Sequence, residues 1–377
     1  MLITYMRSSS YSNFDFCQMQ YYINYVLGIQ RGTSPKAAKG TATHKVLELL
    51  ANMKLQFQKE QTGWIDFKDK ELGKLGTIYL TKFLNPYTLS QTEVDEINRT
   101  RINKQTYKTE CSVPYGHIRY GVELVEELIA KVCKHYDNGW APVDHRDITN
   151  WVWMTLDYNN GAFDPRRRNI VAAEPHFNFG IDREWAKYNW TLANGEEISG
   201  KLEIKGTIDL ITQVGDGILE IVDWKSGQRL DWTSRFDNDV KTYAKLQKDF
   251  QLMLYYYAAR KLYPDVKQII VTIFFIRDGG PFTMCYDEHT LAETEDRLRD
   301  RFNEIGQCIR PTMQDPTQCN FKCKFICDYF KTVSPDNKTN LCRFIHDKIH
   351  EVGIDEVTKA YTNSRFNIGH YEAPGEV

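Results

Sequence analysis

The sequence lacks the features of a membrane protein, an exported protein and a molecular motor. No apolar run among its 377 residues reaches the length of about 20 residues that crosses a bilayer. The N-terminal stretch Met1 to Ser8 is too short and too polar for a secretory signal, so we expect a cytoplasmic protein without a membrane partner. A Gly-X4-Gly-Lys-[Ser/Thr] phosphate loop is also absent, which excludes an ATP-driven motor within this chain.

An excess of charge of either sign is missing too. The chain carries 48 lysines and arginines against 50 aspartates and glutamates, which gives a formal net charge of −2. Overall charge therefore gives no support for binding to a polyanion, and such binding would depend on local basic patches. Three groups are candidates: Arg99, Arg101, Lys104 and Lys108; Arg166, Arg167 and Arg168; and Lys241, Lys245 and Lys248.

The most informative segment is predicted to form a β-hairpin that carries charged residues. Residues 202–213 and 217–225 are rich in aliphatic and β-branched residues, and a Gly-Asp-Gly turn separates them. Alternation along a strand places Asp223 and Lys225 on the same face. Asp209 on the other strand would repel Asp223 unless a divalent cation neutralises the pair. A solvated strand face is the simpler alternative, but the apolar run that precedes Asp223 makes unpaired charges costly and favours the metal site.

The nine cysteines are the second informative feature of the sequence. Three of them lie within nine residues, as Cys319-X3-Cys323-X3-Cys327. Without an export signal, a metal or cluster site is a better interpretation than disulfides. The cysteines at positions 111, 133, 285, 308 and 342 have no ligand spacing and are expected to be free thiols.

The periodicity predicts an α/β protein with a central mixed β-sheet flanked by helices. A mostly helical insertion is expected at about 65–165, with helical periodicity from Lys68 to Phe83, Gly121 to Tyr136 and Asp147 to Tyr158. Residues 331–377 are polar and are expected to form a peripheral extension to a domain at 1–330. Helices are expected at 13–27, 41–57, 240–262 and 288–309, and strands at 169–180, 187–193, 202–213, 217–225, 268–276 and 281–286.

Several sequence motifs follow one another along the chain. They are Cys17 in an N-terminal helix, Gly40-X3-His44, the hairpin with Asp209, Asp223 and Lys225, Gln251-X3-Tyr255, and the C-terminal cysteines. In this order the motifs resemble the PD-(D/E)XK nucleases. The resemblance is to the RecB-type branch, which includes AddB nuclease domains and CRISPR-associated iron–sulfur exonucleases. It spans about residues 8–330 and implies a restriction-endonuclease-like core.

The resemblance implies roles for residues of the hairpin and its neighbours. His44, Asp209, Asp223 and the backbone carbonyl of Trp224 would hold Mg2+ or Mn2+, and Lys225 would be the catalytic lysine. Gln251, Tyr255 and Glu174 would contact DNA or support the metal ligands. Three of these residues have a simpler alternative. His44 could be a capping or surface residue, Tyr255 a core residue and Glu174 an ordinary edge-strand residue. Glu48, one turn after His44, could orient it or form an exposed pair.

The resemblance also implies a [4Fe-4S] cluster held by Cys17, Cys319, Cys323 and Cys327, which would join the two ends of the domain. The family pattern is Cys-X2-Cys-X5-Cys, whereas both gaps here are three residues. Zinc bound by the same four thiolates is an alternative, as is a site without metal. Cys308 could replace one of the four.

Taken together, the sequence predicts a DNA nuclease, and the resemblance favours an exonuclease of recombination or repair acting on DNA ends or single strands. It would work alone or with a helicase or recombination partner. A chain without a motor suits a phage or mobile element, which would place it in the host cytoplasm. The alternatives are a structure-specific or restriction-like endonuclease and a noncatalytic DNA-binding scaffold.

Overall fold

The computed structural model describes residues 1–29, 35–101, 112–137, 139–191, 195–229, 240–278, 280–314, 323 and 327–363. The chain divides into two compact units, each assembled from separate segments. The terminal unit comprises Met1–Gly32, Phe177–Gly206 and Ala292–Val377, and the sheet unit comprises Thr33–His176 and Thr207–Leu291. Among the described helices, none combines the length and apolar character needed to span a bilayer.

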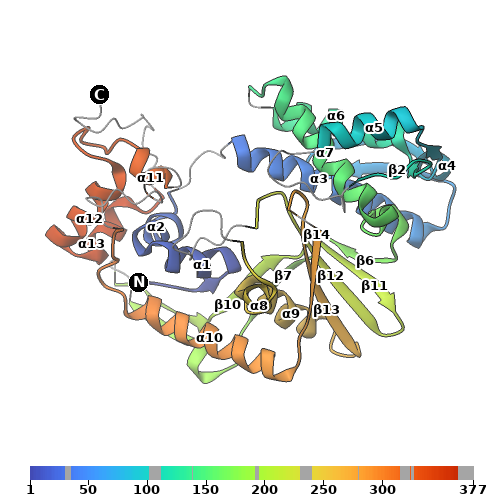
Figure 1. The fold of residues 1–377 in the computed structure, drawn as a ribbon. Coiled ribbons are helices and arrows are strands. Elements are labelled where there is room, and N and C mark those ends of the chain that lie inside the picture. The colour runs from blue at the N-terminus through green and yellow to red at the C-terminus, as the bar shows by residue number, and fades with distance from the viewer. Residues whose placement is uncertain are drawn as a thin grey trace. The chain divides into compact units, whose positions relative to one another are not determined.

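A five-stranded mixed sheet forms the centre of the sheet unit (Figure 1). Its strand order is β14-β13-β12-β11-β6. β12 and β13 are parallel and the other neighbours are antiparallel, so the prediction of a mixed sheet is confirmed. The predicted hairpin is also present, with Leu210 opposite Val222. The strands are β6 (Ile170–Ala173), β11 (Leu210–Gly215), β12 (Ile218–Lys225), β13 (Gln268–Phe275) and β14 (Gly280–Cys285).

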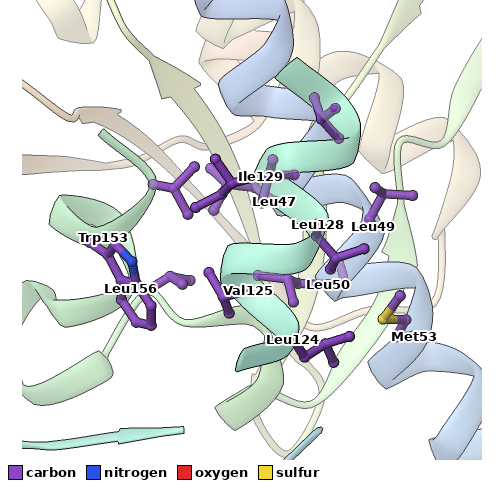
Figure 2. Close-up of a cluster of buried hydrophobic side chains, with 14 of the residues drawn as sticks. Leu47, Leu49, Leu50, Met53, Leu124, Val125, Leu128, Ile129, Trp153 and Leu156 are labelled. Carbon is purple, nitrogen blue, oxygen red and sulfur yellow. The ribbon is translucent and has the colours of Figure 1, made fainter. Parts of the chain in front are cut away.

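Helices cover both faces of this sheet. Val222 and Trp224 of β12 belong to one buried cluster with α3 (Pro35–Glu60), α6 (Val122–Tyr136) and α7 (Pro142–Asp157). Figure 2 shows Leu47 and Leu50 of α3 beside Val125 and Leu128 of α6 within this cluster. Asp223 points to the opposite face, because side chains alternate along a strand. There it meets α9 (Phe250–Leu262), which follows the short helix α8 (Tyr243–Gln247).

The insertion contains a hairpin that the periodicity did not predict. Residues Lys68 to Phe83 were expected to be helical, but β2 (Trp64–Asp69) and β3 (Gly73–Tyr79) form an antiparallel pair that ends in α4 (Leu80–Phe83). Buried and exposed residues alternate strictly along β2, which is the period of a strand. The rest of the insertion contains α5 (Gln91–Arg101) and the pair β4 (Pro86–Thr88) and β5 (Ile118–Tyr120).

The terminal unit combines helices from both ends of the chain with two small sheets. One sheet has the order β1-β10-β7 and the other is the β8–β9 hairpin. Two of its helices, α12 and α13, lie in the predicted polar extension. Its elements are β1 (Tyr5–Met6), α1 (Ser8–Phe16), α2 (Gln18–Tyr21), a π-helical turn (Tyr22–Val26), β7 (His176–Gly180), β8 (Lys187–Thr191), β9 (Glu197–Lys201), β10 (Glu203–Thr207), α10 (Glu288–Gln307), α11 (Asp328–Lys331), α12 (Leu341–Val352) and α13 (Ile354–Tyr361).

Four predicted elements are interrupted in the structure. The strands expected at 169–180 and 202–213 each divide between two sheets, as β6 and β7 and as β10 and β11. The helix expected at 13–27 breaks at Cys17, whose backbone is extended. The helix expected at 240–262 breaks before Asp249, which caps α9 by accepting the Gln251 N–H. The first interruption is important for the site, because Glu174 and Asp209 lie at the two strand breaks.

Candidate functional site

The site lies at the start of β11 and the end of β12, which are neighbours in the β11–β12 hairpin. Asp223 and Lys225 are near the end of β12, and Asp209 immediately precedes β11. Asp209 is 9% exposed, and its Oδ2 accepts the backbone N–H of Trp224 at 2.7 Å. This bond fixes one carboxylate beside the strand that carries the other. Trp224 therefore contributes its amide N–H to the site, and a role for its carbonyl as a ligand stays a prediction.

Helix α3 brings His44 to this carboxylate. His44 Nδ1 lies 3.4 Å from Asp209 Oδ2. Gly40 lies one helical turn earlier, and a Cβ at Gly40 would be 2.6 Å from Ser226 Oγ, immediately after Lys225. The glycine of Gly40-X3-His44 therefore allows α3 to approach the end of β12 closely.

We expect Gly40→Ala to raise the free energy of unfolding but to lower the rate of a reaction catalysed at this site. Alanine is favoured over glycine in a helix by ~1 kcal/mol, but its methyl group would force Ser226 Oγ to move. A misplacement of 1 Å can cost about 10²-fold in rate, and we expect about a tenfold loss because Ser226 can rotate. The double variant Gly40→Ala with Ser226→Ala should recover the rate, since Ser226 Cβ would lie 3.8 Å from the new methyl group. A double variant as slow as Gly40→Ala would refute this role of Gly40.

Glu174 joins His44 and Asp209 in a potential ligand group. Each of the three offers one ligand atom, and these atoms all lie within 4.8 Å of one another. Glu174 has a φ of 48°, in the left-handed region that non-glycine residues rarely adopt, and its N–H donates to Asp209 O at 3.0 Å. This backbone conformation at the break after β6 turns the glutamate toward the other two residues, and such strain is common at functional sites.

The Lys225 ammonium and the Gln251 amide hold Asp223. Lys225 Nζ lies 3.0 Å from Asp223 Oδ1 and 2.8 Å from Oδ2, while Gln251 Nε2 donates to Oδ1 at 3.2 Å. Gln251 also donates to Tyr255 Oη at 2.7 Å, so the two residues of Gln251-X3-Tyr255 act as one unit. Asp223 Oδ2 is buried, and its ion pair with Lys225 holds it rather than a well-aligned hydrogen bond from a described group.

The site concentrates negative charge in a buried space. Burial, followed by the nearby Asp209 and Glu48, raises the pKa of Glu174 to about 8. Burial also raises the pKa of Asp223 to about 6, although Lys225 opposes this. Burial alone would raise the pKa of Asp209, but His44 and Lys225 hold it below its usual value.

These residues fit a divalent cation. Two carboxyl groups and one imidazole offer ligand atoms within 4.8 Å of one another, and the charges of Asp209 and His44 act on the nearby Asp223 carboxyl group. Hard oxygen ligands suit Mg2+, and the imidazole favours Mn2+ somewhat more. A cation would offset the burial and the repulsion from Asp209 that raise the pKa of Glu174.

Near the site, Glu48 has a partner other than the one predicted, and that partner, Lys45, was not predicted to belong to the site. Glu48 pairs with Lys45, with Nζ and Oε2 3.1 Å apart, rather than with His44 as one interpretation proposed. Lys45 is buried and also donates to Asp69 at 2.9 Å, which links α3 to the end of β2. Sequence reasoning missed Lys45 because Asp69 lies on a hairpin that was predicted to be helical.

The predicted basic groups are placed unevenly. Arg166 is 1% exposed and is paired with Asp164, so its expected place in a DNA-binding patch is wrong. Arg168 is paired with Glu220. Lys245 and Lys248 are exposed near the start of α9, and Lys241 pairs with Asp249 at 2.6 Å. Lys104 and Lys108 lie outside the described residues.

Four cysteines line one small cavity in the terminal unit. They are Cys17, Cys323, Cys327 and Cys342, and all four are buried and free of disulfides. Cys319 lies outside the described residues. The Cys308 thiol, a suggested substitute, instead donates to Gln18 Oε1 at 3.8 Å. Cys342 was expected to be an unrelated thiol, because it is 15 residues from Cys327 in the sequence.

Comparison with known proteins connects the site to a family. The family model of the PD-(D/E)XK nuclease superfamily matches residues 8–330. No curated protein matches the sequence. A solved structure of a proposed exonuclease from Eubacterium rectale covers 84% of this chain and 88% of its own, at 11% identity and a TM-score of 0.31. The structure of SSO0001 covers 74% of this chain and 95% of its own, at 15% identity and a TM-score of 0.21.

Proposed function

We propose that this chain, which belongs to the PD-(D/E)XK nuclease superfamily, is a deoxyribonuclease dependent on Mg2+ or Mn2+. The observation that carries the proposal is the convergence of His44, Glu174 and Asp209 in one ligand group beside the Asp223–Lys225 pair. We further propose that it acts as an exonuclease in DNA recombination or repair, alone or with a helicase or recombination partner. This finer assignment is supported by the resemblance to the RecB-type branch.

A divalent cation at His44, Glu174, Asp209 and Asp223 would polarise the scissile phosphate and activate the attacking water. The water oxygen forms the new P–O bond and gives up a proton to the solvent, the bond to the leaving deoxyribose oxygen breaks, and that oxygen takes up a proton from the solvent. Burial alone would lower the pKa of Lys225, but Asp223 and Asp209 raise it above its usual value. Lys225 therefore stays protonated and donates to the phosphate oxygens as negative charge accumulates on them, instead of acting as a base.

Gln251 and Tyr255 position Asp223 for this task. Burial holds the pKa of Tyr255 well above its usual value, so its phenol stays neutral and accepts the Gln251 amide. The second amide hydrogen of Gln251 then reaches Asp223 Oδ1. Lys225 and Gln251 thus fix Asp223 from two sides without neutralising the whole site.

Metal binding is expected to strengthen as pH rises toward the pKa of Glu174. That pKa is about 8, so Glu174 is mostly protonated at neutral pH and must release a proton to become a ligand. The folded-state pKa lies above the unfolded value of 4.5, so the metal-free protein loses stability as pH rises from the lower value to the higher one. The Mn2+-induced increase in Tm should therefore be larger above the pKa of Glu174 than below it.

Thermal unfolding with and without Mn2+ over this pH range checks the prediction. Glu174→Gln should flatten much of the pH dependence, because the amide does not titrate. His44, whose pKa Asp209 raises despite burial, would account for the remainder. A Mn2+ effect that is identical across the range in the wild-type protein would contradict a titrating glutamate ligand.

The mode of cleavage is tested with end-labelled linear single- and double-stranded DNA beside covalently closed circles. Cleavage of linear DNA with intact circles is the expected result for an exonuclease. Cutting of circles would mean an endonuclease. Binding of DNA without metal-dependent cutting of either substrate would favour a scaffold.

We also propose that the cysteines of the terminal unit hold a [4Fe-4S] cluster. The support is the resemblance to the iron–sulfur branch and the set of buried cysteines around one cavity. Its function would be structural, since thiolate ligation of a cluster joins segments that are distant in sequence.

A further inference from the structure

Four cysteines from separate places in the chain converge in the terminal unit. Cys17 interrupts the helix between α1 and α2, and Cys327 directly precedes α11. Cys342 lies in the first turn of α12, and Cys323 completes the group. The cavity between them is otherwise lined by Phe16, Met313, Gln314 and Phe330. Apart from the four cysteines, only Gln314 among these lining residues could offer a ligand atom other than sulfur, so the cavity is lined mainly by potential sulfur ligands and apolar groups.

A short turn of the backbone brings Cys342 back to Cys327. Leu341 N–H donates to Thr332 O at 2.7 Å, and Ser334 N–H donates to Thr339 O at 2.9 Å. The Asn340 side chain then caps α12 by accepting the Arg343 N–H at 2.8 Å. These bonds fix the start of α12, and with it Cys342, beside the end of α11, a four-residue helix that begins directly after Cys327.

The other side of the cavity is held by one local bond and by bonds between the two ends of the chain. Cys17 N–H donates to Asn13 O at 2.9 Å, and Gln314 Nε2 donates to Phe16 O at 2.9 Å. Tyr329 Oη donates to Ile29 O at 2.8 Å, which ties α11 to the N-terminal segment. The four cysteines therefore line one cavity on a framework that protein hydrogen bonds hold in place.

Simple packing is the alternative, because buried cysteines often act as small apolar residues. Packing alone does not require four sulfurs at one point. Cys342 lies in the first turn of the 12-residue helix α12, and it lines the same cavity as Cys17, Cys323 and Cys327.

The spacing of the thiols favours a cluster over a single ion. Among the described histidine, cysteine and acidic side chains, only His44, Glu174 and Asp209 form a group of three whose ligand atoms lie within 4.8 Å of one another. A tetrahedral zinc ion with Zn–S bonds of about 2.3 Å would draw its four sulfurs to ~4 Å from one another. A [4Fe-4S] cluster binds each thiolate to a different iron and so holds the sulfurs farther apart.

From this placement we infer that Cys342 is the fourth cysteine ligand of the metal centre, with Cys17, Cys323 and Cys327. The inference deepens the proposed function and rests on its thiolate-bound cluster. It differs from the sequence pattern in one ligand, since Cys319 is not required. It also gives the C-terminal extension a task, because α12 supplies a ligand and α13 packs beside the N-terminal helices, where Tyr22 Oη lies 2.8 Å from Thr358 Oγ1.

Metal analysis of anaerobically purified variants tests the inference. Iron, acid-labile sulfide and zinc are measured in the wild-type protein and in Cys342→Ala, Cys323→Ala and Cys319→Ala. Cys133→Ala is the matched control, since Cys133 is a buried free thiol of α6 in the sheet unit. We expect Cys342→Ala to lose iron and sulfide as completely as Cys323→Ala, and Cys319→Ala and Cys133→Ala to keep the wild-type content.

Alkylation of the wild-type protein covers the case in which variants fail to fold. Iodoacetamide labelling of each cysteine is measured by mass spectrometry before and after the metal is removed by oxidation and chelation. Cys342 should be protected before removal and labelled afterwards, together with Cys17, Cys323 and Cys327, while Cys133 is unchanged. The same labelling of Cys342 in both states would contradict its role as a ligand.

The remaining outcomes separate the ligand set from the rest of the proposal. Full iron in Cys342→Ala, with loss of iron in Cys319→Ala, would make Cys319 the fourth ligand and overturn the inference. Zinc in the wild-type protein that disappears in Cys342→Ala would support the ligand set and refute the iron–sulfur cluster. A wild-type protein without any metal at these cysteines would overturn both. The nuclease proposal is tested independently, because Asp223→Ala should cut no DNA yet retain its iron.

Discussion

Lys225→Met is expected to lower the rate of DNA cleavage by about 10²- to 10³-fold, the usual loss when one preorganised electrostatic group is removed from an active site. The raised pKa of Lys225 shows that it carries a full charge beside Asp223, and methionine removes this charge while it keeps the length of the side chain. Binding of Mn2+ should persist, because Lys225 is no ligand. The variant should therefore separate chemistry from metal binding.

Single-turnover cleavage and the Mn2+-induced increase in Tm measure the two effects. Lys267→Met is the matched control, since Lys267 pairs with Asp216 in an exposed ion pair at the other end of β12. It should cleave DNA like the wild-type protein. A Lys225→Met protein with more than a tenth of the wild-type rate would remove the lysine from the mechanism, and one without a Mn2+ response would show that Lys225 mainly maintains the metal site.

Asp209→Asn is expected to abolish cleavage and the response to Mn2+ together. Asp209 lies close to His44 and Glu174 in the ligand group, and it alone joins that group to β12 through the Trp224 N–H. The amide oxygen of asparagine can still accept this N–H, so the fold should persist. The lost negative charge weakens the attraction for a divalent cation, and removing one partner of a metal site typically costs far more in activity than in stability.

Circular dichroism, thermal unfolding and cleavage distinguish this outcome from misfolding. The expected variant unfolds near the wild-type Tm without metal, shows no Mn2+ shift and leaves DNA intact. Asp216→Asn, an exposed aspartate in the turn of the same hairpin, should behave like the wild-type protein in all three measurements. A Mn2+ shift of wild-type size in Asp209→Asn would mean that the ion binds elsewhere.

The charged hairpin could be predicted because its signals are local. The aliphatic run that begins at Ile218 defines β12, and the Gly-Asp-Gly turn defines its connection to β11. The spacing of Gln251 and Tyr255 fixes them on one helix face, and their hydrogen bond follows from it. These features depend on periods of two and 3.6 residues, which a sequence displays directly.

The rest depended on tertiary packing. Apolar residues flank both strand breaks, so the sequence predicts one strand where the chain passes between two sheets, as it does at Asp209. The left-handed conformation of Glu174 has no sequence signal, since glycine or asparagine is the usual residue there. Cys342 gave no signal either, because its approach to Cys327 depends on the turn between Thr332 and Leu341.

The most direct test of a metal-dependent nuclease centre at β12 is the cleavage of labelled linear DNA by the wild-type protein and Asp223→Ala, purified side by side and assayed with Mn2+. The account predicts products with the wild-type protein that disappear when the ion is chelated, and none with folded Asp223→Ala. Equal cleavage by both proteins, or intact DNA after incubation with a folded and Mn2+-loaded wild-type protein, would contradict it.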